Sequence, residues 1–421
     1  MLKSSIPKFY QMNLRQRLLL LKKFANLRDN DLKILKSLGG LSLSTANNMV
    51  ENVIGTMALP LGIATNFLIN GKDYLIPMAI EEPSVIAAVS KAAKIARVKG
   101  GFTASAYQSI MIGQLQVVDV KEPLMAGERI LAIKNKIIEL ANRQSKTLAK
   151  KGAGAKDITF RVIDTKQGKM LVVELIIDVG DAMGANVVNS ICEAVAPYVE
   201  DTTQGKVLLK ILSNYATKRL AKASAVFPEE EIGSKVVERI ILAHAFAVSD
   251  QYRSTTHNKG IMNGVIAVAN ATGQDSRAIE AGAHSYAARD GKYSPITSWS
   301  RDSKGDLVGN IEMPLAVGIV GGVSSVHPLA KTCLKIMRVK TAQELAYVMA
   351  SVGLAQNFAA LRALVSEGIQ KGHMRLHAKN IAMLSGAEGK LVDAVAKKIA
   401  EEGNLTTQRA KEVLKALRKH K

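Results

Sequence analysis

The chain has 421 residues, a formal net charge of +21 and 48% hydrophobic residues, a composition typical of a soluble globular protein of two or three domains. It excludes a disordered or collagen-like chain, and the longest nearly apolar stretch, residues 314–326, is too short to span a bilayer. Cys192 and Cys333 are the only cysteines, which excludes a disulfide framework and predicts a reducing, cytoplasmic location.

The positive charge is concentrated at the two ends of the chain. Residues 1–40 and residues 371–421 each carry a net charge of +7. Such a field favours anionic partners, which include nucleic acid, anionic lipid and phosphorylated small molecules. Aromatic residues, on which bases would stack, make up only 4% of the chain, so the usual companion signal of nucleic-acid binding is missing.

In chain order, a mixed α/β stretch over residues 41–107 is followed by the clearest predicted unit, at residues 108–213. Its hydrophobic periodicity predicts four strands and two helices. They are strand 114–120, helix 124–150, strands 157–163 and 170–177, helix 182–198 and strand 206–212. This β-α-β-β-α-β order predicts a ferredoxin-like fold.

After this unit the chain returns to the mixed α/β composition that precedes it. We therefore predict an α+β fold in which residues 1–107 and 214–370 form one large discontinuous domain, with residues 108–213 inserted as a smaller one. The last part, residues 371–421, is predicted to be a small helical domain with two amphipathic helices. They are expected at 389–400 and 407–419.

Common nucleotide and metal motifs are missing from the sequence. No G-x-G-x-x-G follows a strand, and no Walker A lysine loop is present. His373 and His377 are i, i+4 neighbours, but the segment between them lacks the glutamate of a zinc-protease helix and no third ligand is evident. We therefore expect no metal site.

Two polar segments carry residues suited to catalysis. Glu81 and Glu82 lie where a predicted strand meets a helix-like run, although ordinary acidic capping of that helix explains them equally well. Residues 253–260 read as a polar loop that enters an apolar helix, a suitable place for Lys259 to meet a substrate oxyanion; a solvated turn is the alternative. Asp275 lies beyond that apolar run.

A third segment, Asp181–Asn186, begins the second helix of the inserted unit. Its small residues would let a phosphate approach the free N–H groups and the positive end of the helix dipole. Close packing of the helix against the sheet explains the same small residues.

Taken together, these segments resemble one family, the class II, anchor-free form of hydroxymethylglutaryl-CoA reductase. The matching motifs recur in order over nearly the whole chain. They are Glu51–Gly55, Glu81–Ser84, Asp181–Asn186, Thr256–Gly260, Gly273–Asp275 and Gly372–Met374. The resemblance implies the interconversion of hydroxymethylglutaryl-CoA with mevalonate and CoA by two hydride transfers from NAD(P)H, in mevalonate synthesis or breakdown.

The resemblance also implies catalytic roles. Lys259 would stabilise the oxyanion formed by hydride attack. Glu82, with a raised pKa, would donate a proton in the second reduction. Asp275 would join Lys259 and Glu82 in one hydrogen-bonded set, and His373 would protonate the departing CoA thiolate.

Binding roles follow in the same way. Contacts to the hydroxymethylglutaryl or CoA portion are implied for Ser84, Arg253, Asn214 and Asn263. Contacts to the dinucleotide are implied for Asp181, Met183, Gly184, Ala185, Asn186, Ser145 and Lys146. The resemblance further implies that residues 371–421 close over the site as a flap, and that the site lies at a dimer interface, within a hexamer built as a trimer of dimers.

One departure from the family pattern concerns cofactor choice. NADH-preferring relatives carry an aspartate near position 145, where it accepts from the ribose 2′-OH and repels a 2′-phosphate. This chain has Ser145 there, with Arg143, Lys146 and Lys150 nearby. We therefore expect NADPH to be preferred over NADH.

Two alternatives stay open at this point. A related dehydrogenase acting on another acyl-CoA would keep Asp181–Asn186 but would not need Lys259, Glu82 and Asp275 together. A nucleic-acid-binding or anionic-membrane-binding protein would explain the +21 charge, although CoA and NADP phosphates already account for a basic surface. We expect no nucleic-acid partner.

Overall fold

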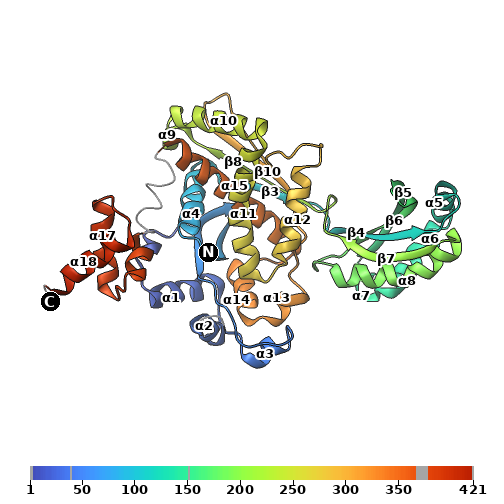
Figure 1. The fold of residues 1–421 in the computed structure, drawn as a ribbon, viewed down its shortest axis with the longest axis horizontal. Coiled ribbons are helices and arrows are strands. Elements are labelled where there is room, and N and C mark those ends of the chain that lie inside the picture. Colours follow the sequence, from blue (N-terminus) through green and yellow to red (C-terminus); the bar gives the residue numbers. More distant parts are fainter. Residues whose placement is uncertain (1–2, 38–39, 150–151, 367–377, 420–421) are drawn as a thin grey trace.

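The computed structural model describes residues 3–37, 40–149, 152–366 and 378–419. Its strands form two separate sheets, one of six strands and one of four, and helices pack against both. Figure 1 shows the four-stranded sheet at one end of the long axis and the C-terminal helices at the other. The predicted α+β class is confirmed.

The six-stranded sheet takes its strands from both sides of the inserted unit. Its order is β2-β1-β3-β8-β10-β9, in which only β1 and β3 pair in parallel. The strands are β1 (Leu61–Ile69), β2 (Lys72–Ala79), β3 (Phe102–Ala106), β8 (Leu220–Phe227), β9 (Thr297–Arg301) and β10 (Leu307–Pro314). Because β3 precedes the inserted unit and β8 follows it, their antiparallel pairing makes the large sheet discontinuous in sequence.

Long helices cover one face of this sheet. They are α4 (Val85–Ala96), α10 (Ser234–Ser249), α11 (Gln251–Thr272) and α15 (Ala342–Ser366), with η2 (Arg97–Lys99), α9 (Glu229–Ile232) and α12 (Ser276–Ala287) beside them. In the core, the rings of Phe227 from β8 and Phe358 from α15 stack with centroids 3.8 Å apart. This burial of apolar faces is the main stabilising contribution.

Helix α15 is the one helix in the described ranges that is long and apolar enough to cross a membrane. Most of its apolar window, 67%, is buried inside the fold, where α15 packs on α11, α4 and the sheet. Its apolarity is therefore explained by its place in the core.

A group of shorter elements covers the far edge of the large sheet near β2. They are η1 (Phe9–Gln11), α1 (Leu14–Ala25), α2 (Asp29–Lys36), α3 (Leu43–Asn47), α13 (Gly322–Val326) and α14 (Pro328–Met337). Phe24 of α1 and Ile336 of α14 bury their side chains against Leu75 of β2. The basic N-terminal segment is thus part of the packed fold.

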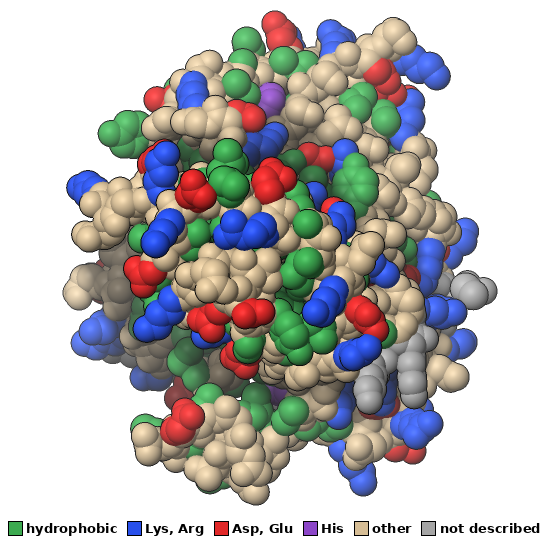
Figure 2. Space-filling model, turned by 90° about the vertical axis from the view of Figure 1, so that its right-hand side faces the viewer, with side chains coloured by type: hydrophobic (Ala, Val, Ile, Leu, Met, Phe, Trp, Pro, Cys, Tyr) green, Lys and Arg blue, Asp and Glu red, His purple; other side chains and the backbone are tan. Residues whose placement is uncertain are grey.

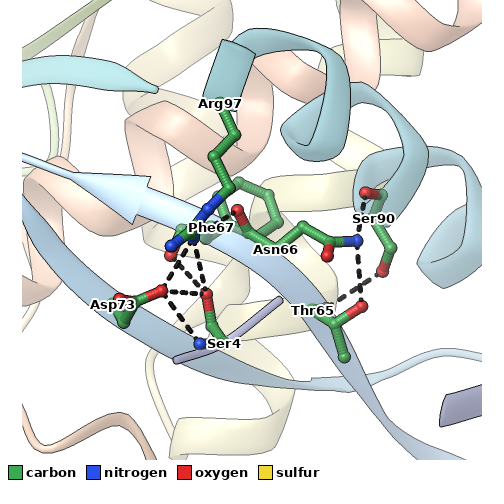
Figure 3. Close-up of polar contacts among 7 residues, drawn as sticks. All are labelled: Ser4, Thr65, Asn66, Phe67, Asp73, Ser90 and Arg97. Carbon is green, nitrogen blue, oxygen red and sulfur yellow. Dashed lines mark hydrogen bonds and ion pairs between the residues drawn. The ribbon is translucent and has the colours of Figure 1, made fainter. Parts of the chain in front are cut away.

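A polar cluster fixes the start of the chain to the sheet (Figure 3). Asp73 Oδ1 accepts hydrogen bonds from Ser4 N at 2.9 Å and Ser4 Oγ at 2.7 Å, and forms an ion pair with Arg97 at 2.7 Å. Asn66 has a positive φ of 71° at the β1 bulge, and its amide donates to Ser90 O at 2.9 Å. The N-terminus is therefore tied to β1, β2 and η2 together.

The inserted unit forms the four-stranded sheet, ordered β5-β6-β4-β7 with every neighbouring pair antiparallel. This is the predicted β-α-β-β-α-β arrangement. Its strands are β4 (Ile110–Val118), β5 (Gly154–Thr165), β6 (Gly168–Asp178) and β7 (Lys206–Ser213), and its second helix is α8 (Ala185–Thr203).

The first helix of this unit differs from the prediction. The single helix expected over 124–150 is three helices, α5 (Pro123–Ala132), α6 (Lys134–Gln144) and α7 (Lys146–Ala149). The breaks fall at Ile133 and Ser145, whose backbones leave the helical region. The breaks let α5 and α6 each pack on both α8 and β5, so tertiary packing overrides a continuous helical pattern.

The C-terminal part has its own small core. A helical segment at 378–384, α17 (Lys390–Glu401) and α18 (Thr407–Lys419) bury Ala382, Val395 and Leu414 against one another. The two predicted amphipathic helices are confirmed. Each end of α17 lies one residue from its predicted position, and α18 has the predicted bounds. A role for this part as a flap stays a prediction.

The end of the molecule that carries the four-stranded sheet faces the viewer in Figure 2. On this face, Lys and Arg side chains are interspersed with acidic and hydrophobic ones. The positive charge seen here is therefore mixed with negative charge at close range, which weakens its field at a distance.

Candidate active site

A cavity of about 420 Å³ lies where α4, α11 and α15 meet. Its wall brings together residues that are far apart in sequence. Of the predicted site residues, it contains Glu82, Ser84, Arg253, Lys259 and Asn263. Three distant segments of the chain thus converge on one space.

Glu82 and Ser84 belong to the short turn between β2 and α4. Ser84 precedes α4 with φ 75° and ψ −22°, a left-handed conformation that is uncommon for residues other than glycine. Its carbonyl nevertheless accepts the first helical hydrogen bond, from Ala88 N at 2.8 Å. This strained turn directs Glu82 towards α11, and such strain clusters at functional sites.

Lys259 and Asn263 both bond to Glu82 from α11. Lys259 Nζ lies 3.2 Å from Glu82 Oε2, and Asn263 Nδ2 donates to the same oxygen at 3.2 Å. Residues four apart share a helix face, so both side chains point the same way. The carboxylate therefore holds a cation and an amide side by side in the cavity.

The segment 253–260 was expected to be a loop, and that expectation is wrong. It is the first part of α11, which begins at Gln251. The helix starts here because the side chain of Asp250 accepts a hydrogen bond from Arg253 N at 2.7 Å and so caps the helix. The polar composition of the segment favoured a loop and gave no sign of this cap. Lys259 consequently sits on a rigid helix.

Arg253 lies one turn and a half before Lys259, half-buried in the same wall. Burial lowers the pKa of its guanidinium, which nonetheless stays charged at neutral pH because its ordinary value is above 12. A half-buried arginine beside an open cavity is well placed to bind a carboxylate through two parallel hydrogen bonds.

His257 lies behind Lys259 in a buried polar network with a defined proton position. Trp299 Nε1, which can only donate, bonds Asn357 Oδ1 at 2.8 Å. That bond orients the amide of Asn357, so its Nδ2 donates to His257 Nε2 at 3.1 Å. His257 Nε2 is therefore an acceptor. Burial, with His244 and Arg253 nearby, lowers the pKa of His257 to about 3, so the ring is neutral.

Helix α15 also contributes to this cavity, which was not expected from the sequence. Gln356, Asn357 and Arg362 line it. A signal was available: Gln356 and Asn357 are adjacent polar residues inside a long apolar run, and buried polar side chains require partners. Adjacent amides in such a run indicate a polar wall.

Asp275 is not in this cavity. It caps α12, accepting from Arg277 N and Ala278 N at 3.1 Å each, and its carboxylate forms an ion pair with Arg277 at 3.2 Å. Lys259 lies near the middle of α11 and Asp275 lies three residues beyond its C-terminal end, which separates them by about 20 Å at about 1.5 Å per residue. The expected contact of Asp275 with Lys259 and Glu82 is therefore not made within one chain.

Asn214 also lies away from the cavity. It follows β7 on the way back to the large sheet and is exposed. Its carbonyl closely approaches Gly282 of α12, where an added Cβ would be 2.9 Å away. Asn214 is thus on the same side of the fold as Asp275.

The loop Asp181–Gly184 precedes α8, which begins at Ala185. Gly184 has φ 108°, and a Cβ there would meet the side chain of Val179 at 2.7 Å, so only glycine fits this close turn. The helix N-terminus, with Met183, Gly184, Ala185 and Asn186 around it, presents free N–H groups as an anion site requires. The Asp181 carboxylate itself accepts from Ala342 N at the start of α15, at 2.8 Å.

Ser145 lies at the same end of the four-stranded sheet as this loop. It ends α6. Three residues earlier, Asn142 Oδ1 accepts from Ala155 N at 2.8 Å and Asn142 Nδ2 donates to Ala155 O at 3.2 Å. Ala153, which leads into that contact, lies next to Gly180. Lys146 begins α7, and its side chain lies outside the described part of the structure.

Comparison with known proteins gives the family. A model of the family described as hydroxymethylglutaryl-coenzyme A reductase matches residues 13–378. The chain belongs to this family. A 3-hydroxy-3-methylglutaryl-coenzyme A reductase of Archaeoglobus fulgidus is 57% identical over 416 residues, which cover 99% of this chain and 95% of the relative. A probable reductase of Borreliella burgdorferi is 38% identical over 346 residues, covering 80% and 78%.

Solved structures agree with the sequence relatives. A class II 3-hydroxy-3-methylglutaryl-CoA reductase from Streptococcus pneumoniae, bound to NADPH in open conformations, is 40% identical and has a TM-score of 0.81, covering 97% of this chain and 100% of that one. A second structure of the reductase from this organism has a TM-score of 0.83 at 40% identity, covering 98% and 99%. The predicted reductase family and its class II form are confirmed.

One predicted catalytic residue of the reductase, His373, lies outside the described residues, as does His377. Among the residues that the structure describes, no three His, Cys, Asp or Glu side chains gather as a metal site would require. The candidate site residues in the described ranges therefore gather in two places, the cavity of Glu82, Lys259 and Arg253 and the loop before α8.

Proposed function

We propose that the chain reduces hydroxymethylglutaryl-CoA to mevalonate and CoA. The observation that carries the proposal is the Lys259 ammonium held 3.2 Å from the Glu82 carboxylate, inside a cavity whose wall also contains Arg253. Together they supply a cation for an oxyanion, an acid and a receptor for a carboxylate. These are the three groups needed to reduce a thioester that also carries a free carboxylate.

The residues divide the work in two stages. In the first, the thioester carbonyl oxygen gains negative charge, and Lys259 stabilises it. In the second, the aldehyde oxygen becomes an alcohol, and Glu82 supplies its proton. Arg253, Ser84 and Asn263 orient the hydroxymethylglutaryl portion, and His373 protonates the CoA thiolate that leaves between the stages.

Two reduced nicotinamide dinucleotides, bound one after the other, would supply the two hydrides, one hydride each. The residues around the start of α8 fit the pyrophosphate of the dinucleotide, because Gly184 leaves room where a Cβ would clash and the helix N-terminus offers N–H donors. Met183, Ala185 and Asn186 complete that anion site. Ser145, at the same end of the sheet, lies where a ribose phosphate would be read.

A second copy of the chain completes the site. Asp275 and Asn214 lie on the cofactor side of the fold, away from Lys259, so they serve the Lys259 and Glu82 of a partner. The arm between α3 and β1 supports such a dimer, because it exposes Val50, Ile54 and Met57, with Ile54 at 102% of its reference area. Exposed apolar clusters of this kind mark interaction surfaces. Three such dimers would form the hexamer.

Two further parts of the proposal concern the chain's surroundings. Residues 371–421 act as a flap that carries His373 to the site and excludes water during each stage. The chain works in the cytoplasm, which suits its two cysteines, both free and buried.

Loss of reduced nicotinamide absorbance on adding hydroxymethylglutaryl-CoA tests the function. Lys259→Met should lower kcat by about 10²- to 10³-fold because it removes the oxyanion's cation. The matched control is Lys331→Met, since Lys331 is an exposed lysine of α14 outside the cavity. Consumption of the dinucleotide with other acyl-CoA thioesters but not with this one would overturn the proposal.

A further inference from the structure

The segment 315–320, which follows β10, runs between two short stretches of chain. One is the turn at residues 273–275 (the Asp275 turn), and the other is the loop Asp181–Gly184, to which the proposed function assigns the dinucleotide (the cofactor loop). On one side the segment meets Gln274, the residue next to Asp275. Gln274 Nε2 donates to Gly318 O at 2.9 Å, and Gly318 N donates to Gln274 Oε1 at 2.8 Å. This reciprocal pair fixes the Asp275 turn to the segment in both directions.

On its other side the segment meets the cofactor loop through Arg219. The Arg219 side chain is 4% exposed. It donates to Met183 O at 2.8 Å, to Ala182 O at 3.0 Å and to Val317 O at 2.5 Å. One buried guanidinium therefore holds the loop and the segment together, through backbone carbonyls that have no freedom to turn away.

Backbone contacts close the joint. Ile319 N donates to Asp181 O at 2.9 Å, and Ala182 pairs with Val320 as an isolated bridge. A Cβ on Gly318 would collide with the backbone of Ala182 and Met183. The segment 315–320 and the cofactor loop are therefore in direct backbone contact. Neither side can shift by much without breaking a hydrogen bond that is part-buried or buried.

We propose that Gln274, Gly318 and Arg219 couple the cofactor loop to Asp275, so that binding of the dinucleotide and placement of Asp275 are set together. The inference rests on the proposed function, in which Asp275 and the dinucleotide reach the same reacting carbon. Gln274 and Arg219 are positioning residues: they act through the backbone of the loop and of the Asp275 turn.

The coupling has a physical cause. Donors and acceptors shielded from water destabilise the fold when they lose their partners. A small displacement of the cofactor loop therefore moves the Asp275 turn with it. If only one of them moved, Gln274 or Arg219 would lose a hydrogen bond. A ligand that orders the loop also orders the Asp275 turn, and loosening the turn loosens the loop.

The test measures NADPH binding to the full-length protein by fluorescence titration without substrate, and turnover at saturating NADPH and hydroxymethylglutaryl-CoA. Gln274→Ala should weaken NADPH binding by about three- to thirtyfold, and it should lower kcat as well. Gln274→Glu keeps the size and the acceptor but loses the donor to Gly318 O, so it repeats the test if the alanine variant does not fold. Arg219→Lys should give the same two changes.

Two control variants separate this inference from the catalytic one. Asp275→Asn should lower kcat and leave NADPH binding unchanged. Gln11→Ala, which removes an exposed side-chain amide near the N-terminus, should change neither kcat nor NADPH binding. Unchanged NADPH binding in Gln274→Ala or Gln274→Glu would overturn the coupling, as would equal weakening by Asp275→Asn. Full turnover in Asp275→Asn would instead remove the proposed catalytic role of Asp275, while the effect of Gln274 on NADPH binding would stand.

Discussion

At the scale of single residues, the site depends on how a few backbone positions aim short side chains. Ser84 adopts a left-handed backbone so that Glu82 can reach α11, and the Asp250 cap starts that helix early enough to place Lys259 opposite Glu82. Neither feature adds chemistry of its own. Each fixes the distance at which a carboxylate and an ammonium meet.

We predict that Ser145 sets the preference between NADPH and NADH. Replacing it with aspartate should place a carboxylate where the adenosine ribose is read, which favours a 2′-OH and repels a 2′-phosphate. We expect Ser145→Asp to lower kcat/KM with NADPH by about tenfold, or about 1.4 kcal/mol, and to spare that with NADH. Steady-state kinetics with each dinucleotide measure this, and Ser145→Asn is the uncharged control. A wild-type enzyme that already favours NADH would contradict the preference.

His257 should make stability depend on pH. Its pKa is about 3 in the folded chain and about 6.5 when unfolded. Because the folded value is lowered, the stabilising contribution of the neutral ring is complete above about pH 6.5 and is lost progressively as the pH falls towards 3, at up to about 1.4 kcal/mol per pH unit.

Urea unfolding at pH 7.5 and 5.5 measures this effect. The wild type should lose about 1 kcal/mol more than His257→Gln between the two conditions, since glutamine has no proton to gain. Equal losses in both proteins would show that the unfolding free energy does not depend on the protonation of this ring.

At the scale of elements, α11 and α15 form the central crossing, and glycines set its closeness. A Cβ on Gly264 would lie 3.0 Å from Gln356 Cβ and 3.2 Å from Val352 O, and one on Gly353 would lie 3.0 Å from Val265. The helices that carry Lys259 and Asn357 therefore touch through backbone. This contact brings both polar walls of the cavity into range.

A matched pair of glycines in α11 isolates that packing contribution. Gly264→Ala should be less stable than Gly260→Ala by about 1–3 kcal/mol in the free energy of unfolding, because only the first new methyl meets neighbours. Both changes bring the same gain in helix propensity, about 1 kcal/mol, so their difference reports packing alone. Equal stability would mean that the crossing can open without cost.

At the scale of the whole molecule, Lys259 lies near the middle of the long helix α11, whereas Asp275 follows its C-terminal end and caps α12. The four-stranded sheet lies on the α12 side of α11 (Figure 1). We infer that one chain carries two half-sites, one around Lys259 and one around Asp275. A dimer in which each half-site meets its complement satisfies both halves at once.

Mixing two inactive variants tests this arrangement. Lys259→Ala and Asp275→Asn each lose activity alone, but a mixed dimer holds one site with both native residues. After unfolding and refolding an equal mixture, we expect about a quarter of the wild-type activity, because half of the dimers are mixed and each has one intact site. The separately refolded variants are the control, and activity no higher than theirs would show that Asp275 acts within its own chain.

The sequence by itself determined the α+β class, the β-α-β-β-α-β unit, the C-terminal helices and the family. These follow from hydrophobic periodicity and from motifs whose residues are neighbours in the chain, such as Glu81–Ser84 and Thr256–Gly260. Glu82, Lys259, Arg253, Ser84 and Asn263 were predicted as one site from the resemblance, and the structure brings them to one cavity.

Only the tertiary structure decided the rest. The breaks at Ile133 and Ser145, the polar wall of α15 and the separation of Asp275 from Lys259 depend on contacts between residues far apart in sequence. The helical state of residues 253–260 instead follows from the local cap at Asp250, which the polar composition did not reveal. Local periodicity records which face of an element is apolar, but it carries no information about which other element that face will meet. Packing settles that choice, and with it the distances on which catalysis depends.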